Sequence, residues 1–144
     1  RISGAERGVI TFGNCCHPIP GDPIIGFLSA GKGLVVHQTT CRNVVEMRKH
    51  PERIVRVDWE PEVHGDFRVQ LRIDVANRPG VLATVAAAIA ENNSNIENVE
   101  YLDRDSLSAS LLFTIEVRHR EHLAEVMKRV RRADVVLMVQ RAQS

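Results

Sequence analysis

The chain has 144 residues, of which 44% are hydrophobic, and a formal net charge of +1, as in a globular protein rather than a disordered one. The balanced charge gives no reason to expect a nucleic-acid or membrane partner, and the longest apolar stretch, near residues 81–90, is about half of the roughly 20 residues that a membrane-spanning helix needs. The three cysteines all lie within the first 41 residues and cannot all pair, which favours a soluble, cytoplasmic protein over a secreted disulfide scaffold.

The first 59 residues have the pattern of a small α+β domain. Short strands are expected at residues 8–12, 24–28, 34–37 and 54–59, with a short helix over residues 40–49. Gly31-Lys32-Gly33 lacks the other features of a phosphate-binding P-loop and predicts a hairpin turn.

We interpret the polar stretch 60–66 as a linker. Because the chain starts without methionine in structured-looking sequence, we expect a fragment of a longer protein.

Residues 67–144 are patterned more regularly. Apolar and polar residues alternate over residues 67–75, which predicts a strand with one buried face. Amphipathic helices are expected over residues 81–93 and 121–131. The side chains expected on their buried faces are Leu82, Val85, Ala86, Ile89, Leu123, Val126, Met127 and Val130.

Three more strands, expected at residues 96–102, 107–117 and 134–141, complete the order βαββαβ. With right-handed crossovers, this order gives a four-stranded antiparallel sheet with two helices on one face, the ferredoxin-like arrangement. The predicted fold class is therefore α+β, with a small Cys/His domain at residues 1–59 and a ferredoxin-like domain at residues 67–144.

A group of cysteine and histidine residues in the first half is a candidate metal site. Cys15 and Cys16 follow the first expected strand, whereas His37 ends a later strand and Cys41 begins a helix. Three thiols and one imidazole are ligands that structural zinc sites use. Adjacent side chains diverge in an extended backbone, however, so one thiol of the pair can point away and His17 can take its place.

Two other interpretations of these residues remain open. Free cysteines are often small buried hydrophobic residues, and His37 would then be a hydrogen-bonded histidine at a strand end. Alternatively, a Cys–His pair can form a nucleophile, although no third orienting group or oxyanion hole is evident.

Two features of the second half are candidate binding sites. The turn Asn77–Gly80 opens directly into a helix, whose free backbone N–H groups can bind a small carboxylate, although Pro79-Gly80 can equally serve as a simple tight turn. The basic residues Lys128, Arg129, Arg131 and Arg132 fall at a helix C-terminus, where cations offset the helix dipole. With only Tyr101 and Phe113 in the relevant strands, base stacking is disfavoured.

Two segments resemble known families. The stretch NRPGVLATVAAAIAENNSNIENV within βαββαβ resembles the ACT domain, a regulatory module that binds amino acids or related small ligands, often at a dimer interface. Upstream, CCHPIPGDPIIGFLSAGKGLVVHQTTC resembles the conserved-cysteine, or zinc-finger, domain of the RelA/SpoT homologues, and its details favour the SpoT-like bifunctional branch. The pairing of these two domains is typical of the C-terminal end of that family.

The resemblance implies a non-catalytic regulatory part of a stringent-response (p)ppGpp synthetase/hydrolase, with the catalytic domains upstream and absent here. It implies a branched-chain amino acid bound by the ACT domain, and a homodimer formed through that domain. The alternative is a module that docks on the ribosome, its RNA or a protein and binds no small molecule. A thiol enzyme using Cys15 or Cys16 is a third class.

The resemblance also implies site residues. The cysteine-domain ligands, for zinc if a metal is bound, would be Cys15, Cys16, His37 and Cys41. The residues of the ACT ligand site would be Asn77, Arg78, Pro79, Gly80, Val81 and Leu82, with Asn95 and Ile96 from the next strand of the same chain or of a partner.

Overall fold

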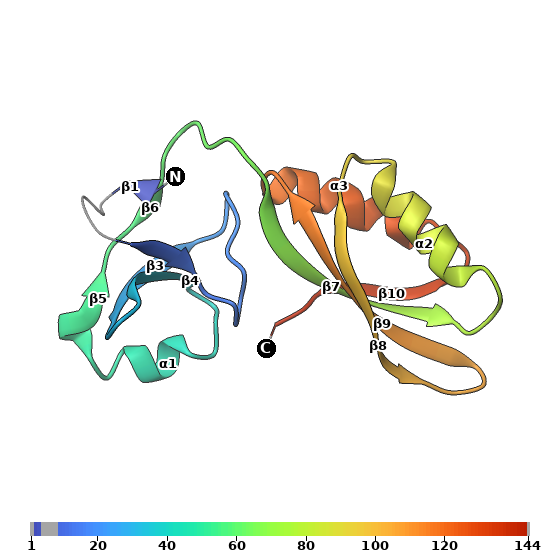
Figure 1. Cartoon of the computed structure of the whole chain (residues 1–144), viewed down its shortest axis with the longest axis horizontal. Coiled ribbons are helices and arrows are strands. Elements are labelled where there is room, and N and C mark those ends of the chain that lie inside the picture. The colour runs from blue at the N-terminus through green and yellow to red at the C-terminus, as the bar shows by residue number, and fades with distance from the viewer. Residues whose placement is uncertain (1, 4–8, 144) are drawn as a thin grey trace. The chain divides into compact units, whose positions relative to one another are not determined.

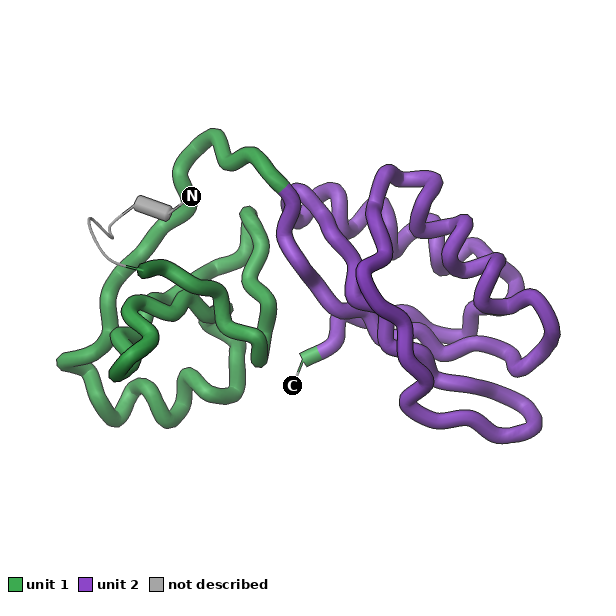
Figure 2. The backbone as a smooth tube through the Cα atoms, viewed as in Figure 1, with its two compact units in different colours: residues 1–65, 143–144 green, residues 66–142 purple. Residues whose placement is uncertain are grey.

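The computed structural model describes residues 2–3 and 9–143, and the chain forms two compact units that divide between Gly65 and Asp66 (Figure 2). Each unit has its own sheets and its own apolar core. Within the described residues, no helix combines the length and the apolar composition needed to cross a membrane.

The first unit is built on a four-stranded sheet in the order β2-β4-β3-β5 (Figure 1). Its strands and helices are β2 (Ile10–Phe12), β3 (Ile24–Ser29), β4 (Gly33–Gln38), α1 (Val44–Met47), a 3₁₀ turn (Pro51–Arg53) and β5 (Ile54–Val55). β3 and β4 form the expected antiparallel hairpin through Gly31, whereas β2 is parallel to β4. A separate two-stranded ribbon pairs β1 (Ile2–Ser3) with β6 (Asp58–Trp59).

Both faces of this sheet are covered. Successive residues of a strand point to opposite faces, so the β3–β4 hairpin contributes to two apolar clusters. One contains Leu34, Val36 and Val57, with Phe12 stacked on Trp59. The other contains Cys16, Cys41, Val44 and Met47. The cysteines are therefore part of the core of this unit.

Two expectations for the first unit were wrong in detail. The strand expected at residues 54–59 is interrupted at Arg56 and Val57, because β5 pairs with β3 whereas β6 pairs with β1 in another sheet. The helix expected over residues 40–49 has only the four residues of α1, since a turn at Gln38–Cys41 positions the Cys41 sulfur before the helix begins. Gly8, the first residue of the strand expected at 8–12, lies outside the described residues.

The second unit has the predicted ferredoxin-like arrangement. Its elements are β7 (Phe67–Ala76), α2 (Val81–Ala90), β8 (Ile96–Arg104), β9 (Ser108–Val117), α3 (Arg120–Arg131) and β10 (Val136–Arg141). The sheet order is β10-β7-β9-β8 with every neighbouring pair antiparallel, and both helices lie on one face (Figure 1). β8 and β10 are its two edge strands.

The core of this unit lies between the two central strands and the helices. Val69, Leu71, Ile73 and Val75 of β7 are fully buried, and so are most inward residues of β9, including Phe113. The alternation in the sequence thus identified the buried face of both strands. A pleated strand that buries alternate side chains leaves the polar residues between them on the other face.

The buried face of α2 differs from the prediction. Val81, Val85, Ala88 and Ile89 are buried, whereas Leu82 is 39% exposed. The helix starts at Val81, directly after Gly80 with φ of +82°, and Val81 rather than Leu82 is turned toward the core. One consequence is an apolar side chain on the outer face at the first turn.

His122 of α3 is a buried polar residue that the sequence pattern did not identify. Its side chain is 4% exposed, Nδ1 accepts a hydrogen bond from the Arg118 N–H at 3.0 Å, and Nε2 lies 2.6 Å from the Asn92 carbonyl oxygen. The ring therefore joins the start of α3 to the turn after α2. His119 caps the same helix by accepting from the His122 N–H.

We expect His122→Ala to lower the free energy of unfolding of the second unit by about 2–4 kcal/mol, because it leaves a cavity and removes the hydrogen-bond partner of the Arg118 N–H and the Asn92 carbonyl. His64→Ala, the same change at an exposed residue, should alter it by less than about 0.5 kcal/mol. Urea unfolding followed by circular dichroism measures both values. Equal stability of the two variants would show that the His122 bridge does not stabilise the fold.

Candidate functional site

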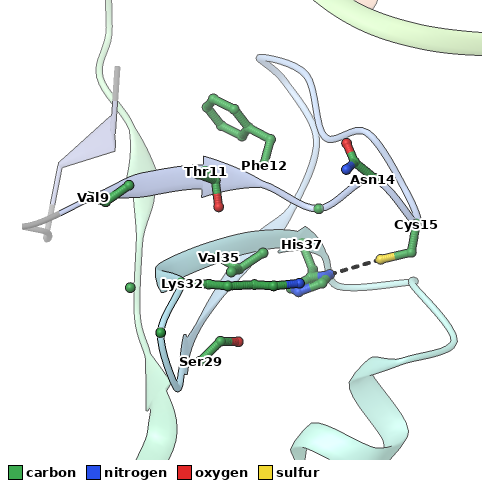
Figure 3. A pocket seen from close by; sticks show the side chains of 12 residues that line it. Val9, Thr11, Phe12, Asn14, Cys15, Ser29, Lys32, Val35 and His37 are labelled. Carbon is green, nitrogen blue, oxygen red and sulfur yellow. Dashed lines mark hydrogen bonds between the residues drawn. The ribbon is translucent and has the colours of Figure 1, made fainter.

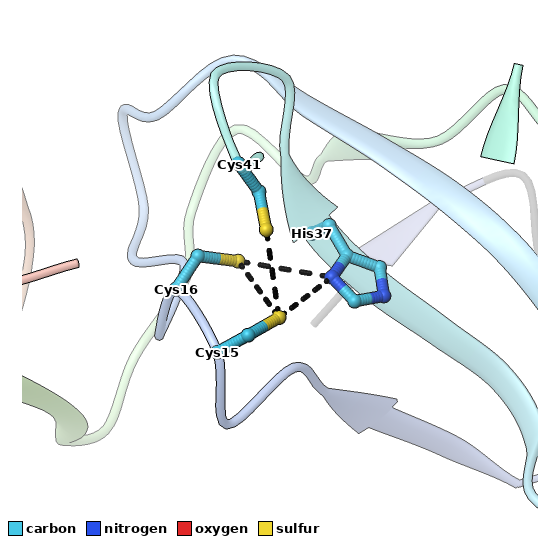
Figure 4. Close-up of side chains that lie close together, drawn as sticks. All are labelled: Cys15, Cys16, His37 and Cys41. Carbon is cyan, nitrogen blue, oxygen red and sulfur yellow. Dashed lines mark hydrogen bonds between the residues drawn. The ribbon is translucent and has the colours of Figure 1, made fainter. Parts of the chain in front are cut away.

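Four side chains of the first unit converge into a compact group. The ligand atoms of Cys15, Cys16, His37 and Cys41 all lie within 4.8 Å of one another. They come from the turn after β2, the end of β4 and the segment before α1 (Figure 4). These are the four residues that the sequence singled out.

The turn at residues 13–17 explains how two adjacent thiols face the same point. The N–H groups of Cys16 and His17 both approach the Gly13 carbonyl oxygen, at 3.4 and 2.9 Å, and His17 has φ of +45°. The backbone is therefore curled rather than extended, and the Cys15 and Cys16 sulfurs lie 4.0 Å apart. Among the described residues, the cluster does not include His17. His17 therefore does not take the place of one of the two thiols, as the sequence had left open.

Gln38 holds the cluster together but was not identified from the sequence. Its backbone N–H lies 3.3 Å from the Cys16 sulfur, and its side-chain amide donates to the Cys16 carbonyl oxygen at 2.6 Å. Its own carbonyl accepts from the Cys41 N–H at 3.0 Å. The residue after His37 thus fixes both of the more deeply buried cysteines. In the sequence, the only indication of this role of Gln38 is its position next to His37.

The distances within the cluster fit a tetrahedral metal site. Zinc–sulfur bonds of about 2.3 Å and zinc–nitrogen bonds of about 2.05 Å imply ligand separations of about 3.8 Å between sulfurs and about 3.6 Å between sulfur and nitrogen. The Cys15 sulfur lies 3.5 Å from that of Cys41 and 4.0 Å from that of Cys16. His37 Nδ1 lies 3.2 Å from Cys15 Sγ and 3.8 Å from Cys16 Sγ. These four separations lie near the tetrahedral values and the other two do not exceed 4.8 Å, so the group could hold a metal after a contraction of about 1 Å.

Burial favours the uncharged forms of Cys16, Cys41 and His37 when no metal is present. Desolvation raises the pKa of the Cys16 thiol to about 12 and raises that of Cys41 as well, while it lowers the pKa of His37. A neutral imidazole is the form that binds metals, whereas each thiol must lose its proton on binding. Metal uptake would thus release protons, and it would remove the desolvation cost of the thiolates by pairing them with a cation.

The other two interpretations of the cluster have unequal support. The thiols do pack against Val44 and Met47, so a role in the core is real whether or not a metal binds. A Cys–His nucleophile needs a third group that orients the imidazole. Among the described residues, the four-membered cluster that includes His37 contains thiols and no carboxylate. The cluster itself therefore offers no acidic residue in that role.

The turn before α2 is the second candidate site. Asn77–Gly80 is exposed. The Asn77 backbone N–H donates to the Leu107 carbonyl oxygen at 3.0 Å, and its side-chain amide donates to the Asp105 carbonyl oxygen. Gly80 has φ of +82°, with no atom within 4 Å of the position that a Cβ would take. The start of α2 is therefore open to a small molecule. Val81 is buried beneath it, and Leu82 lies beside it at the surface.

Asn95 and Ile96 lie far from this turn in the same chain. Ile96 pairs with Ile115, which in turn pairs with Val69, whereas the turn follows Ala76 at the other end of β7. Seven residues of strand separate the two positions, or about 23 Å. The structure brings together Asn77, Arg78, Pro79, Gly80, Val81 and Leu82, but a site that also contains Asn95 and Ile96 requires a second chain.

The basic residues at the end of α3 are partly neutralised. Arg129 forms a two-pronged ion pair with Glu91, while Lys128, Arg131 and Arg132 are exposed. Tyr101 is exposed on β8, but the Arg104 guanidinium lies over its ring at 4.5 Å from the centroid. Phe113 is fully buried. This arrangement agrees with the expectation that base stacking is disfavoured.

Comparison with known families divides the chain as the fold does. The RelA/SpoT RIS domain family matches residues 1–60, and the ACT domain family matches residues 64–141. Among solved structures, the ACT domain of a GTP pyrophosphokinase from Chlorobium tepidum aligns with 54% of this chain and all of that domain, at 20% identity and a TM-score of 0.48. That likeness is too weak to support an argument.

Whole proteins similar to this chain are much longer than it is. The bifunctional (p)ppGpp synthase/hydrolase SpoT of Escherichia coli is 39% identical over 140 residues, which are 97% of this chain and 20% of that protein. A GTP pyrophosphokinase of Streptomyces coelicolor is 34% identical over 143 residues, and the bifunctional RelA of Mycobacterium tuberculosis is 33% identical over 143 residues. The chain spans about one fifth of the length of these relatives.

Gly13 is a second residue of the cluster that sequence reasoning missed. A Cβ at this position would lie 2.7 Å from His37 Nδ1 and 3.3 Å from Cys15 Sγ. We expect Gly13→Ala to displace the imidazole and to lower the melting temperature of the first unit by several degrees. Asn14→Ala is a suitable comparison, because it changes the adjacent residue, which is exposed and has no positive φ. If His37 kept its NMR chemical shifts in Gly13→Ala, the close approach would not be a constraint.

Proposed function

Because this chain belongs to the ACT domain family and carries, with its RIS domain, the C-terminal regulatory region of RelA/SpoT (p)ppGpp enzymes, we propose that it senses a branched-chain amino acid. The ACT domain binds the amino acid, and its occupancy controls catalytic domains that lie upstream in the same protein. The chain itself carries out no reaction.

The open turn before α2 is the observation that carries this proposal. Backbone N–H groups at a helix start are suited to an α-carboxylate, and Gly80 allows close approach because no side chain covers it. Thr84 donates its hydroxyl to the Gly80 carbonyl oxygen at 3.1 Å, which stabilises the turn. The neighbouring exposed surface of Leu82 offers apolar contact for a branched side chain.

A two-fold dimer would complete such a site. β8 is an edge strand, so two copies can pair their β8 strands in antiparallel fashion. In that pairing the start of one β8 meets the end of the other. The end of β8 lies near the Asn77 turn, since Arg104 pairs with Ala109, which pairs with Val75. The partner chain would thereby bring its own Asn95 and Ile96 toward the turn, which a single chain does not do.

Control by occupancy requires that the ligand bind two arrangements of the full protein unequally. A ligand with equal affinity for both shifts nothing, however tightly it binds. A site shared between two chains meets this requirement, because it is complete only when the chains are paired. The dimer is therefore the arrangement that the amino acid would favour.

We also propose that the RIS domain holds one zinc ion through Cys15, Cys16, His37 and Cys41. A unit of about 60 residues buries a modest core, and metal binding adds directly to its folding free energy. The thiols must stay reduced for this purpose, which a cytoplasmic location provides.

The first test is calorimetric titration with valine and isoleucine. We expect heat of binding and a thermal shift at millimolar ligand. Gly80→Ala should weaken binding about tenfold or more by adding a Cβ at the approach of the ligand. Gly31→Ala imposes the same strain of a positive φ in the other unit and should leave the affinity unchanged.

Absence of heat and of any thermal shift would reject amino-acid sensing. If the protein instead bound RNA with an affinity that falls steeply as the salt concentration rises, the alternative of a docking module would be favoured. Lys128, Arg131 and Arg132 are the exposed cations that such binding would use.

The zinc proposal has its own test. Purified protein should carry about one zinc per chain, and a strong chelator should lower the melting temperature of the first unit while sparing the second. Cys16→Ser and His37→Ala should each lose the metal. His17→Ala, which changes a neighbouring histidine outside the cluster, should keep it. Metal-free protein whose stability is unchanged in chelator would leave the thiols as packing residues.

A further inference from the structure

One of the three clustered thiols differs from the others in its access to solvent. Cys16 and Cys41 are 2% and 4% exposed, whereas Cys15 is only half-buried. A pocket of about 840 Å³ opens beside Cys15, and its lining also includes Asn14, Lys32 and His37 (Figure 3). Among the described residues that line this pocket, Cys15 is the one cysteine. A small solute can therefore reach its sulfur without unfolding the domain.

A second thiol lies within reach of Cys15 behind this opening. The Cys41 sulfur is 3.5 Å from that of Cys15, and a disulfide requires about 2.05 Å, so the two atoms need to approach by only about 1.5 Å. Cys41 belongs to the segment between β4 and α1, and a four-residue helix follows it. This connection is better suited to such a shift than the strands of the sheet are.

The third thiol is a poorer partner. Cys16 lies 4.0 Å from Cys15, and a disulfide between adjacent residues closes a small strained ring. Its sulfur also accepts the Gln38 N–H at 3.3 Å, and its carbonyl accepts the Gln38 side chain. These bonds hold the Cys16 sulfur in place, whereas the Gln38 bond to Cys41 holds only its backbone N–H and leaves the Cys41 side chain to turn toward Cys15.

From this geometry we propose that Cys15 is an oxidation site, at which a hydroperoxide produces a reversible Cys15–Cys41 disulfide. In the first step the Cys15 sulfur attacks the peroxide, the O–O bond breaks, and the products are Cys15 sulfenic acid and water or an alcohol. In the second step the Cys41 thiol attacks the sulfenic sulfur, the S–O bond breaks, and water leaves. The peroxide is reduced and the two thiols are oxidised by two electrons.

The disulfide and a metal exclude each other. Oxidation removes two of the four ligands and leaves Cys16 and His37, which are too few for a closed structural site. This consequence rests on the proposed zinc site, whereas the disulfide itself requires only the three thiols. The cluster would then report oxidising conditions to the rest of the regulatory region.

Peptide mapping tests the disulfide. The reduced, metal-free chain is treated with one equivalent of hydrogen peroxide, the remaining thiols are alkylated, and trypsin is added. Cys15 and Cys16 share the peptide 8–32, and Cys41 lies on the peptide 33–42. We expect these two peptides to be joined within one chain, with one free thiol left of three, and to separate in dithiothreitol.

Matched variants identify the reacting thiol. Cys16→Ala retains Cys15 and Cys41, and it should form the link at the rate of the unchanged protein. Cys15→Ala retains the buried pair and should form it at least about tenfold more slowly. In Cys41→Ala, dimedone should label Cys15 as a sulfenic acid. In urea the difference between the first two variants should disappear, because access is then equal for all thiols.

Other results would overturn the proposal. These are equal rates for Cys15→Ala and Cys16→Ala under native conditions, or a link that joins two chains. In zinc-loaded protein, release of zinc to a colorimetric chelator should accompany the loss of two thiols. If the protein binds no zinc, the metal proposal fails and the disulfide measurement still decides the oxidation site.

Discussion

The contact between the Cys15 sulfur and His37 Nδ1, at 3.2 Å, lies at the centre of the Cys/His cluster of the first unit. It joins the turn after β2 to the end of β4, where the Gly13 N–H also donates to the Val36 carbonyl oxygen at 2.8 Å and Gln38 bonds to Cys16. Gly13 permits the contact because any Cβ there would overlap the imidazole. The small core of this unit is divided between the two faces of its sheet, so apolar packing stabilises the unit only modestly. The contacts within the cluster add to that stabilisation.

This arrangement has a chemical consequence. A cluster of reduced thiols beside a neutral imidazole can bind a metal, pack as a core or be oxidised, and the same short distances serve all three. Burial separates the roles of the sulfurs: Cys16 and Cys41 are shielded, while Cys15 faces a pocket. Under the proposals above, a change in the ligands of the cluster would alter the stability of the whole unit.

The second unit is stabilised in another way. Its central strands β7 and β9 bury nearly all their inward side chains, and the helices complete the core without any special ligand. The turn at Gly80 is thereby free to remain exposed, because the stability of the fold does not depend on what covers it. The edge position of β8 is the feature on which the proposed pairing of two chains rests.

The sequence by itself determined the βαββαβ order and the buried faces of β7 and β9, because periodicity is a local property. It also indicated Cys15, Cys16, His37 and Cys41 as candidate ligands, with His17 as an alternative to one thiol. Only the tertiary structure decided that both adjacent thiols turn inward, since this depends on the curled backbone after Gly13. It also decided that Val81 rather than Leu82 faces the core of α2, and that the stretch at residues 54–59 divides between two sheets. Gln38, Gly13 and His122 owe their roles to partners distant in the chain, and no pattern of neighbouring residues could have predicted those contacts.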